Sequence, residues 1–352
     1  LVAHVIELKT NGPSRSLEGL SDKFWGEVQF INKILASKNA MLLPTGAHPL
    51  FEPMSETVIW PHEYNEVYAL YDRIFGCKGH GWSNLQSTHI NLPFANDEEF
   101  EKLHAAVRVL LPLIPAIAAS TPIIEAKSTG FIDTRLEYYR RNQQKIPVIA
   151  GLVVPEPAFS QKQYEELIFS SVARAIEPYD EEKILDKHFL NSRGAIARFD
   201  RGAVEIRVID IQESPKADLA ILELISASLQ WLIERFEGNL ETLKTDCSTE
   251  ELAGIFIECV KYGSLSETSN QKFLSLFGMA GSANMRLIWE VIFDQVKDRM
   301  ESGHGVIKII LNEGNLSERM LQRLAGDPSE EGVIALYREL ALCLENNQVF
   351  RV

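Results

Sequence analysis

Two charged side chains in one alternating segment have the types and spacing that chemistry on a charged substrate requires. Residues 204–211 read V-E-I-R-V-I-D-I, which places Glu205 and Arg207 on one face of a predicted strand and mainly apolar residues on the other. A carboxylate binds cations, and a guanidinium binds phosphate or carboxylate groups. The same pattern is also typical of a sheet face in solvent, where Glu205 and Arg207 form a surface charge pair. Residues elsewhere in the chain have to decide between the two interpretations.

Two further segments predict strands with a possible metal ligand on a polar face. Residues 2–9 alternate weakly and contain Glu7, and residues 84–92 alternate with His89 and Asn91 on the same face. Carboxylates with one neutral imidazole suit Mg²⁺ or Mn²⁺ better than zinc. Glu7, His89 and Glu205 are therefore candidate metal ligands, although Glu7 alone is also typical of a surface residue.

Two loops carry candidate binding residues. His48 lies in P-T-G-A-H-P, residues 44–49, directly after a predicted short strand over residues 40–43. Thr129 lies in S-T-G, residues 128–130, and Arg135 follows; together they offer hydroxyl groups and a guanidinium to an anion. Both loops are equally compatible with ordinary surface structure.

Two arginines are candidates for binding the phosphate groups of a nucleotide. Arg135 and Arg207 are candidates for holding phosphate beside a metal ion, as ATP-driven phosphoryl transfer requires. The sequence contains neither G-x-x-x-x-G-K-[ST] nor G-x-G-x-x-G. A nucleotide site would therefore be built on a sheet.

A predicted hairpin positions the central strand. The apolar run 195–199 and the turn residues 200–202 precede it. A two-residue loop, Arg201-Gly202, places Arg198 on the face of Glu205, whereas a three-residue loop from Asp200 places it on the other face.

The pattern of elements predicts an α+β fold. Capping residues and apolar periodicity predict helices starting near Ser14 or Ser16, Pro61, Asn96, Ser160, Ser214 and Ser248. The predicted strands all precede about residue 212, and the last third is helical. We therefore predict a single domain, residues 1–352, with a sheet-forming part (1–212) and a mainly helical part (213–352).

Composition restricts the class of protein. The 352 residues carry a net charge of −14, which argues against binding to nucleic acid or to an anionic membrane. The most apolar run, residues 107–119, is too short to span a membrane and contains prolines. No signal peptide is visible. Four scattered cysteines without ligand spacing favour reduced thiols and a cytoplasmic location. The expected partners are small-molecule substrates, and the helical third offers packing surface and a homodimer surface.

Five motifs occur in an order that resembles a known family. They are V-I-E-L-K-T (5–10), G-A-H-P (46–49), S-T-H-I-N-L (87–92), S-T-G-F-I-D-T-R (128–135) and G-A-V-E-I-R-V-I-D (202–210). Together they resemble the glutamate–cysteine ligase type 2, or carboxylate–amine ligase, family of the glutamine-synthetase-like superfamily. The resemblance extends from the first residues to about residue 240.

The resemblance implies a fold and an activity. The fold would be a curved, mainly antiparallel sheet with helices packed outside. The activity would be ATP-dependent amide-bond formation through an acyl phosphate, most simply between glutamate and cysteine, in glutathione biosynthesis.

The resemblance also implies site residues. It implies Mg²⁺ or Mn²⁺ on Glu7, His89 and Glu205, with Arg207 near the transferred phosphate. Arg135 would lie near the phosphate or the substrate carboxylates. Further ATP- or substrate-binding residues would be His48, Asn91, Thr129 and Arg198.

One departure from the family pattern bears on activity. The family begins with a G-x-E-x-E strand whose carboxylates hold metal, and this sequence contains no such segment. We expect either that native N-terminal sequence is missing or that the protein lacks part of its metal site. The alternatives are a ligase for another acid or amine, and a non-catalytic protein that binds nucleotide or amino acid.

Overall fold

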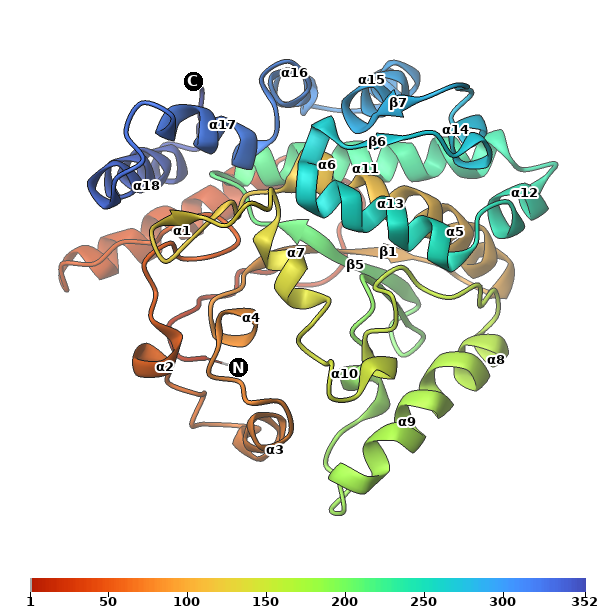
Figure 1. Ribbon diagram of the computed structural model, residues 1–352, viewed down its shortest axis with the longest axis horizontal. Helices are drawn as coiled ribbons and strands as arrows, with labels where there is room; N and C mark the ends of the chain where they lie inside the picture. The colour runs from red at the N-terminus through yellow and green to blue at the C-terminus, as the bar shows by residue number, and fades with distance from the viewer. Residues whose placement is uncertain (1) are drawn as a thin grey trace.

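A small antiparallel sheet lies at the centre of the chain (Figure 1). The computed structural model describes residues 2–352. The sheet has the order β1-β5-β4, with β1 over Ser87–Pro93, β5 over Ala203–Asp210 and β4 over Ala195–Arg198. The strand β5, which contains Glu205 and Arg207, is therefore the central one and is paired on both sides.

The loop between β4 and β5 is longer than either length considered from the sequence. Arg198 pairs with Ala203, so residues 199–202 form a four-residue loop. Gly202 adopts a left-handed conformation with φ 60°, which glycine adopts at no steric cost. Directly paired residues share a face, and Ala203 lies on the same face of β5 as Glu205, two residues further along. Arg198 therefore lies on the face of Glu205, as the two-residue loop also predicted.

A β-bulge interrupts the pairing between β1 and β5. Thr88 pairs with Ile209 and Ile90 pairs with Ile206, so that His89 faces both Arg207 and Val208. A bulge bends the strand and changes the direction of its side chains. Val208 and Ile209 are both buried in the main core, so the strict alternation predicted for residues 204–211 ends at Val208.

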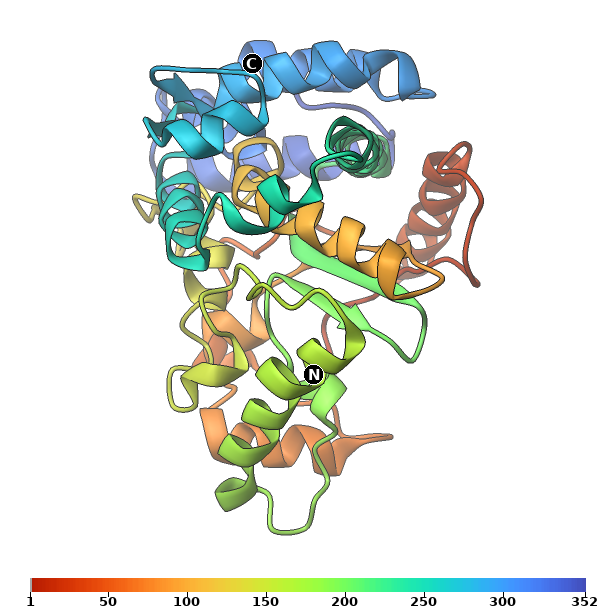
Figure 2. The same cartoon turned by 90° about the vertical axis from the view of Figure 1, so that its right-hand side faces the viewer.

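The two faces of the sheet meet different helices. In Figure 1, α5 (Asp97–Leu110), α11 (Pro215–Arg235) and α13 (Thr249–Tyr262) lie on one side of the sheet, and α8 (Gln161–Tyr164), α9 (Ser170–Ile176) and α10 (Lys187–Leu190) lie on the other. Val204, Ile206 and Val208 are buried in the main core with α5 and α11. In Figure 2 the C-terminal helices form the upper layer over this core.

Local capping signals place the starts of α5, α11 and α13 correctly. The Asn96 side chain accepts a hydrogen bond from the Glu99 amide at the start of α5, and Ser214 caps α11. Ser248 and Glu251 form the predicted capping box of α13. The helices predicted near residues 16–35 and 61–74 are α1 and α3, but their predicted starts are wrong: α1 begins after Gly19 and α3 after Tyr64, both without a side-chain cap. Their bounds and those of the other helices are α1 (Leu20–Ala36), α2 (Pro53–Glu56), α3 (Asn65–Phe75), α4 (His80–Ser83), α6 (Pro115–Ala118), α7 (Thr134–Tyr139), α12 (Leu240–Thr245), α14 (Gln271–Leu276), α15 (Met285–Val296), α16 (His304–Glu313), α17 (Leu316–Leu324) and α18 (Glu330–Glu345).

The predicted first strand and the predicted strand at residues 40–43 are wrong. Residues 5–10 and 40–44 are irregular, and Val2 makes only an isolated bridge to Ile59. The exposed fraction of Ile6 is 51%, so the face of this segment that carries Ile6 is not buried against a sheet.

The fold is α+β and mostly helical. The other strands form two-residue pairs: β2 (Ile123–Ile124) with β3 (Lys127–Ser128), and β6 (Glu267–Thr268) with β7 (Ala283–Asn284). Within residues 2–352, the larger curved sheet that the resemblance implied is not seen. The last third is helical as predicted, apart from β6 and β7. Over the same residues, no helix combines the length and apolar character needed to cross a bilayer.

Candidate active site

Glu205 is the centre of a charged cluster on the polar face of the sheet. Its side chain accepts a hydrogen bond from Nε of Arg207 at 2.7 Å. Nη1 of Arg198 lies 3.7 Å from the same carboxylate, and Nδ1 of His89 lies 3.6 Å from it. Only 5% of Glu205 is exposed. The interpretation of Glu205 and Arg207 as a solvated surface pair is therefore wrong for Glu205.

The cluster fixes the protonation states of its members. Burial by itself raises the pKa of Glu205, but Arg207, His89 and Arg198 outweigh burial and lower it. Burial opposes the charge of Arg207, yet Tyr139 and Glu205 raise its pKa. Loss of hydration on burial, followed by the positive charge of Arg207, lowers the pKa of His89 to about 4. Near pH 7 the cluster therefore holds an ionised carboxylate, cationic guanidinium groups and a neutral imidazole.

Asn91 and Arg198 flank this cluster. Asn91 is exposed and pairs directly with Glu205 across the strands, so it lies on the same face. Arg198 donates to the Asp200 carboxylate from Nε at 3.0 Å and from Nη2 at 2.8 Å. This local pair holds the Arg198 guanidinium beside Glu205.

Arg135 lies beneath the cluster. Its guanidinium donates to Asp210 through Nε and to the main-chain carbonyl of Arg207 through both Nη atoms, at 3.4 Å. Only 3% of the Arg135 side chain is exposed. Arg135 thus contacts the backbone that carries Arg207, and its bonds are to protein atoms.

His48 and Thr129 are positioned by local hydrogen bonds. The His48 ring accepts from the Leu50 amide at 3.1 Å, and burial lowers the pKa of that ring. The Thr129 hydroxyl accepts from the Phe131 amide at 3.2 Å in the turn before α7. Within residues 2–352 no hydrogen bond or ion pair joins His48 or Thr129 to Glu205. Their predicted binding roles remain predictions.

Glu7 does not join the other candidate metal ligands. It is exposed in the irregular segment before α1. The described chain, residues 2–352, contains no group of three or more His, Cys, Asp or Glu side chains arranged around a common metal position. His89 and Glu205 are the two predicted ligands that the structure brings together.

As donor types, the His89 imidazole and the Glu205 carboxylate suit Mg²⁺ or Mn²⁺. Metal binding needs a neutral imidazole and an ionised carboxylate, and these are the states that the cluster favours. Mg²⁺ is ordinarily bound through one or two carboxylates together with substrate phosphates, and Glu205 is the carboxylate of this pair.

Sequence reasoning missed two residues of this region. Asp210 is fully buried and holds Arg135, and Tyr139 raises the pKa of Arg207. A carboxylate that ends an apolar strand is a signal for a buried partner, and Asp210 has that pattern. Tyr139 has no comparable local signal.

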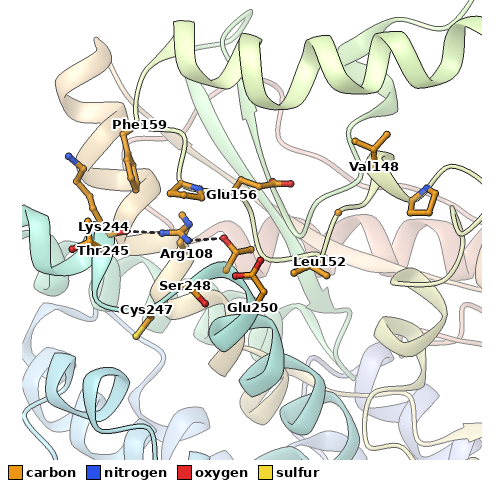
Figure 3. A pocket seen from close by; sticks show the side chains of 14 residues that line it. Arg108, Val148, Leu152, Glu156, Phe159, Lys244, Thr245, Cys247, Ser248 and Glu250 are labelled. Atoms are coloured by element: carbon orange, nitrogen blue, oxygen red, sulfur yellow. Dashed lines mark hydrogen bonds between the residues drawn. The ribbon is translucent and has the colours of Figure 1, made fainter.

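A cavity of about 760 Å³ lies at another place in the molecule (Figure 3). It is lined by Arg108, Phe159 and Lys244 among others, and by none of the predicted site residues. The Arg108 guanidinium donates to the carbonyls of Pro155 and Lys244 and to the Thr249 hydroxyl. Arg108 therefore links α5 to the start of α13.

Comparison with known proteins identifies the family. Residues 1–252 match the pattern of glutamate-cysteine ligase family 2. An uncharacterised protein of Archaeoglobus fulgidus is 34% identical over 356 aligned residues, which cover 99% of this chain and 87% of that protein. Members of this family are typically ATP-dependent carboxylate–amine ligases. The motif resemblance is thereby confirmed, and the chain belongs to glutamate-cysteine ligase family 2.

Proposed function

We propose that this protein is an ATP-dependent carboxylate–amine ligase of the glutamate–cysteine ligase type. The observation that carries the proposal is the cluster on β5, where ionised Glu205 lies beside cationic Arg207 and Arg198 and neutral His89. Family membership over residues 1–252 supports the same reaction class.

The proposed reaction has two steps. A carboxylate oxygen of the acid substrate attacks the γ-phosphorus of ATP. The bond to the β–γ bridging oxygen breaks, and ADP leaves with the electron pair. The nitrogen of an unprotonated amine then attacks the acyl carbon, and inorganic phosphate leaves as the C–O bond breaks. The nitrogen loses one proton to solvent, and an amide remains.

Arg207 and Arg198 are proposed to bind the anionic groups of this reaction. Both guanidinium groups are partly exposed on the face of Glu205, with 21% and 15% of their side chains accessible. Preorganised cations stabilise charge that develops on transferring phosphoryl groups. The hydrogen bond from Arg207 to Glu205 keeps the guanidinium in place. A guanidinium that is already held loses less rotamer freedom when it binds a phosphate.

Glu205 and His89 are the residues that would hold Mg²⁺, with Mn²⁺ as the alternative. When bound, such an ion neutralises phosphate oxygens and polarises the transferring group. Glu7 stays a prediction as a third ligand, because it is exposed and lies apart from this pair.

The activity test is ADP release from the full chain with ATP, Mg²⁺, glutamate and a panel of amines that includes cysteine. We expect Glu205→Ala and Arg207→Ala each to lower kcat at least about a hundredfold while the circular dichroism spectrum stays native. Near-normal turnover in both variants would show that the cluster is not the active site.

A second function has one observation in its favour. Of the three predicted metal ligands, exposed Glu7 lies apart from His89 and Glu205, and this incomplete ligand set suits a protein that binds nucleotide or amino acid without turnover. That function predicts that ATP raises the melting temperature while no amine stimulates ADP release. Stimulation by an amine other than cysteine would instead identify a ligase with a different second substrate.

A further inference from the structure

We infer that Asp210 is a positioning residue that fixes Arg207 through Arg135 and seats the G-A-H-P loop at the same point. The inference deepens the proposed function and rests on it for the kinetic readout. The ¹⁵N-arginine signal of Arg207 is a second readout, which does not depend on ligase activity.

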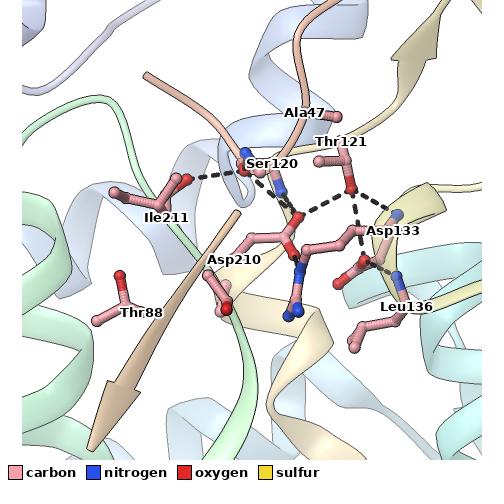
Figure 4. Close-up of polar contacts among 12 residues, drawn as sticks. Ala47, Thr88, Ser120, Thr121, Asp133, Leu136, Asp210 and Ile211 are labelled. Atoms are coloured by element: carbon pink, nitrogen blue, oxygen red, sulfur yellow. Dashed lines mark hydrogen bonds and ion pairs between the residues drawn. The ribbon is translucent and has the colours of Figure 1, made fainter. Parts of the chain in front are cut away.

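Asp210 is a fully buried carboxylate with partners on both oxygens (Figure 4). Oδ1 accepts from Nε of Arg135. Oδ2 accepts from the Ser120 amide at 2.9 Å and from the Thr121 hydroxyl at 2.9 Å. A charged group buried to this degree is stable only when it is paired and hydrogen-bonded. Each of these contacts therefore fixes the segment that makes it.

The path from Asp210 to Arg207 runs through one side chain. Both Nη atoms of Arg135 donate to the carbonyl of Arg207, at the point where the bulge interrupts the pairing of β5 with β1. The Arg207 amide donates to the carbonyl of Gly194 at 2.8 Å. The main chain of Arg207 is thus held at its amide by the Gly194 carbonyl and at its own carbonyl by the Arg135 guanidinium.

The same carboxylate seats the loop that carries His48. The Gly46 amide donates to the Ser120 hydroxyl at 2.9 Å. A Cβ atom at Gly46 would lie 2.9 Å from Cγ of Asp210 and 2.7 Å from Cγ2 of Thr121. The loop therefore packs directly on the Asp210 network, and glycine is required for this approach.

Asp210 is the counter-charge of Arg135. Asp133 also lies next to this network, but burial and the neighbouring Asp210 raise the pKa of Asp133 well above its ordinary value. The Asp133 side chain caps α7 by accepting from the Leu136 amide at 2.8 Å. Asp210 is thus the carboxylate that forms the ion pair with the Arg135 guanidinium, and α7 delivers Arg135 to that pair.

A second buried pair supplies a matched control. Arg319 and Glu213 are fully buried and their side chains lie 3.1 Å apart. Their further contacts are to Gly314 and Phe350, near the C-terminus. Glu213→Gln should therefore lower stability without moving Arg207.

The kinetic test is a double-mutant cycle in ADP release. We expect Asp210→Asn to lower kcat about tenfold or more, with a much smaller change in the KM for ATP. In an Arg207→Met background the same change should lower kcat less than about twofold, because its effect acts through Arg207. Glu213→Gln should leave kcat unchanged in both backgrounds. Equal fold-losses from Asp210→Asn in the two backgrounds would overturn the inference.

The spectroscopic test uses protein labelled with ¹⁵N-arginine. The Nε–H of Arg207, held by Glu205, should give a resolved signal that is absent in Arg207→Met. We expect Asp210→Asn to shift or broaden this signal and Glu213→Gln to leave it in place. An unchanged signal in Asp210→Asn would contradict the inference, whether or not the protein is a ligase.

Arg135→Lys keeps the test decisive if Asp210→Asn does not fold. A lysine retains the charge beside Asp210, but its single ammonium cannot reach both Asp210 and the Arg207 carbonyl in the fork geometry of a guanidinium. We expect this variant to fold, to shift the Arg207 signal and to lower kcat about tenfold. A folded Arg135→Lys protein with a native signal and native kcat would overturn the inference.

Discussion

Asp218 is a buried carboxyl group whose ionisation should lower the stability of the fold. It lies in the first turn of α11 and is only 7% exposed. Oδ1 accepts from the Thr88 hydroxyl at 2.8 Å and from the Gln212 amide at 3.0 Å. Burial, opposed by these two bonds, raises the pKa of Asp218 from 3.8 to about 7.

The sign and size of the effect follow from linkage. Below pH 4 the carboxyl is protonated in both the folded and the unfolded chain, so the folded state carries no penalty. Between pH 4 and 7 the unfolded chain releases a proton that the folded chain keeps, so stability falls by about 1.4 kcal/mol per pH unit. Over the whole interval the loss is at most about 4 kcal/mol, and the helix N-terminus reduces it by up to about 1 kcal/mol.

The perturbation that isolates this effect is Asp218→Asn. The asparagine Oδ1 can accept the same two hydrogen bonds but does not ionise. We expect the variant to have near-native stability at pH 4.5 and to be about 2–3 kcal/mol more stable than the native protein at pH 8. The measurement is the free energy of unfolding in urea at half-unit pH steps, plotted as the difference between the two proteins.

Asp294→Asn is the control, because 69% of the Asp294 side chain is exposed. Its difference from the native protein should be flat between pH 4.5 and 8. A flat difference for Asp218→Asn as well would refute the reasoning, since the carboxyl would then ionise alike in the folded and unfolded chains.

Two further predictions concern stability. Glu213→Gln leaves Arg319 as a fully buried cation without its partner, and we expect the free energy of unfolding in urea to fall by about 3–5 kcal/mol; a loss below about 1 kcal/mol would contradict this. Gly46→Ala places a methyl group 2.7 Å from Cγ2 of Thr121, and we expect a loss of about 1–3 kcal/mol together with lower ADP release. Gly254→Ala in α13 is the matched control, because a Cβ atom there would have no neighbouring atom within 4 Å. This change should leave the free energy of unfolding unchanged or raise it.

Elements defined by local interactions were predictable from the sequence. The side chains of Asn96, Ser214 and Ser248 cap their helices as their positions indicated. Each cap depends on atoms within about three residues, so its signal is complete in a short window of sequence. The alternation of the central strand likewise placed Glu205 and Arg207 on one face, whatever packs against that face.

Elements that depend on a distant partner were predicted poorly. Residues 2–9 alternate weakly, yet only an isolated bridge between Val2 and Ile59 forms there, because a strand needs a partner strand along its length. The bulge opposite His89 depends on β1, and a single strand cannot reveal it. Glu7 therefore lies apart from His89 and Glu205, although all three have suitable chemistry.

The sequence by itself determined the starts of the helices that Asn96, Ser214 and Ser248 cap, the polar face of the central strand and the family that its motifs indicate. Only the tertiary structure decided which charges meet. Arg135 follows a loop that offered hydroxyl groups to an anion, but its guanidinium is buried against Asp210, 75 residues away in the chain. The physical reason is that a buried charge has to find its counter-charge, and the fold brings together groups whose separation in the sequence carries no local signal.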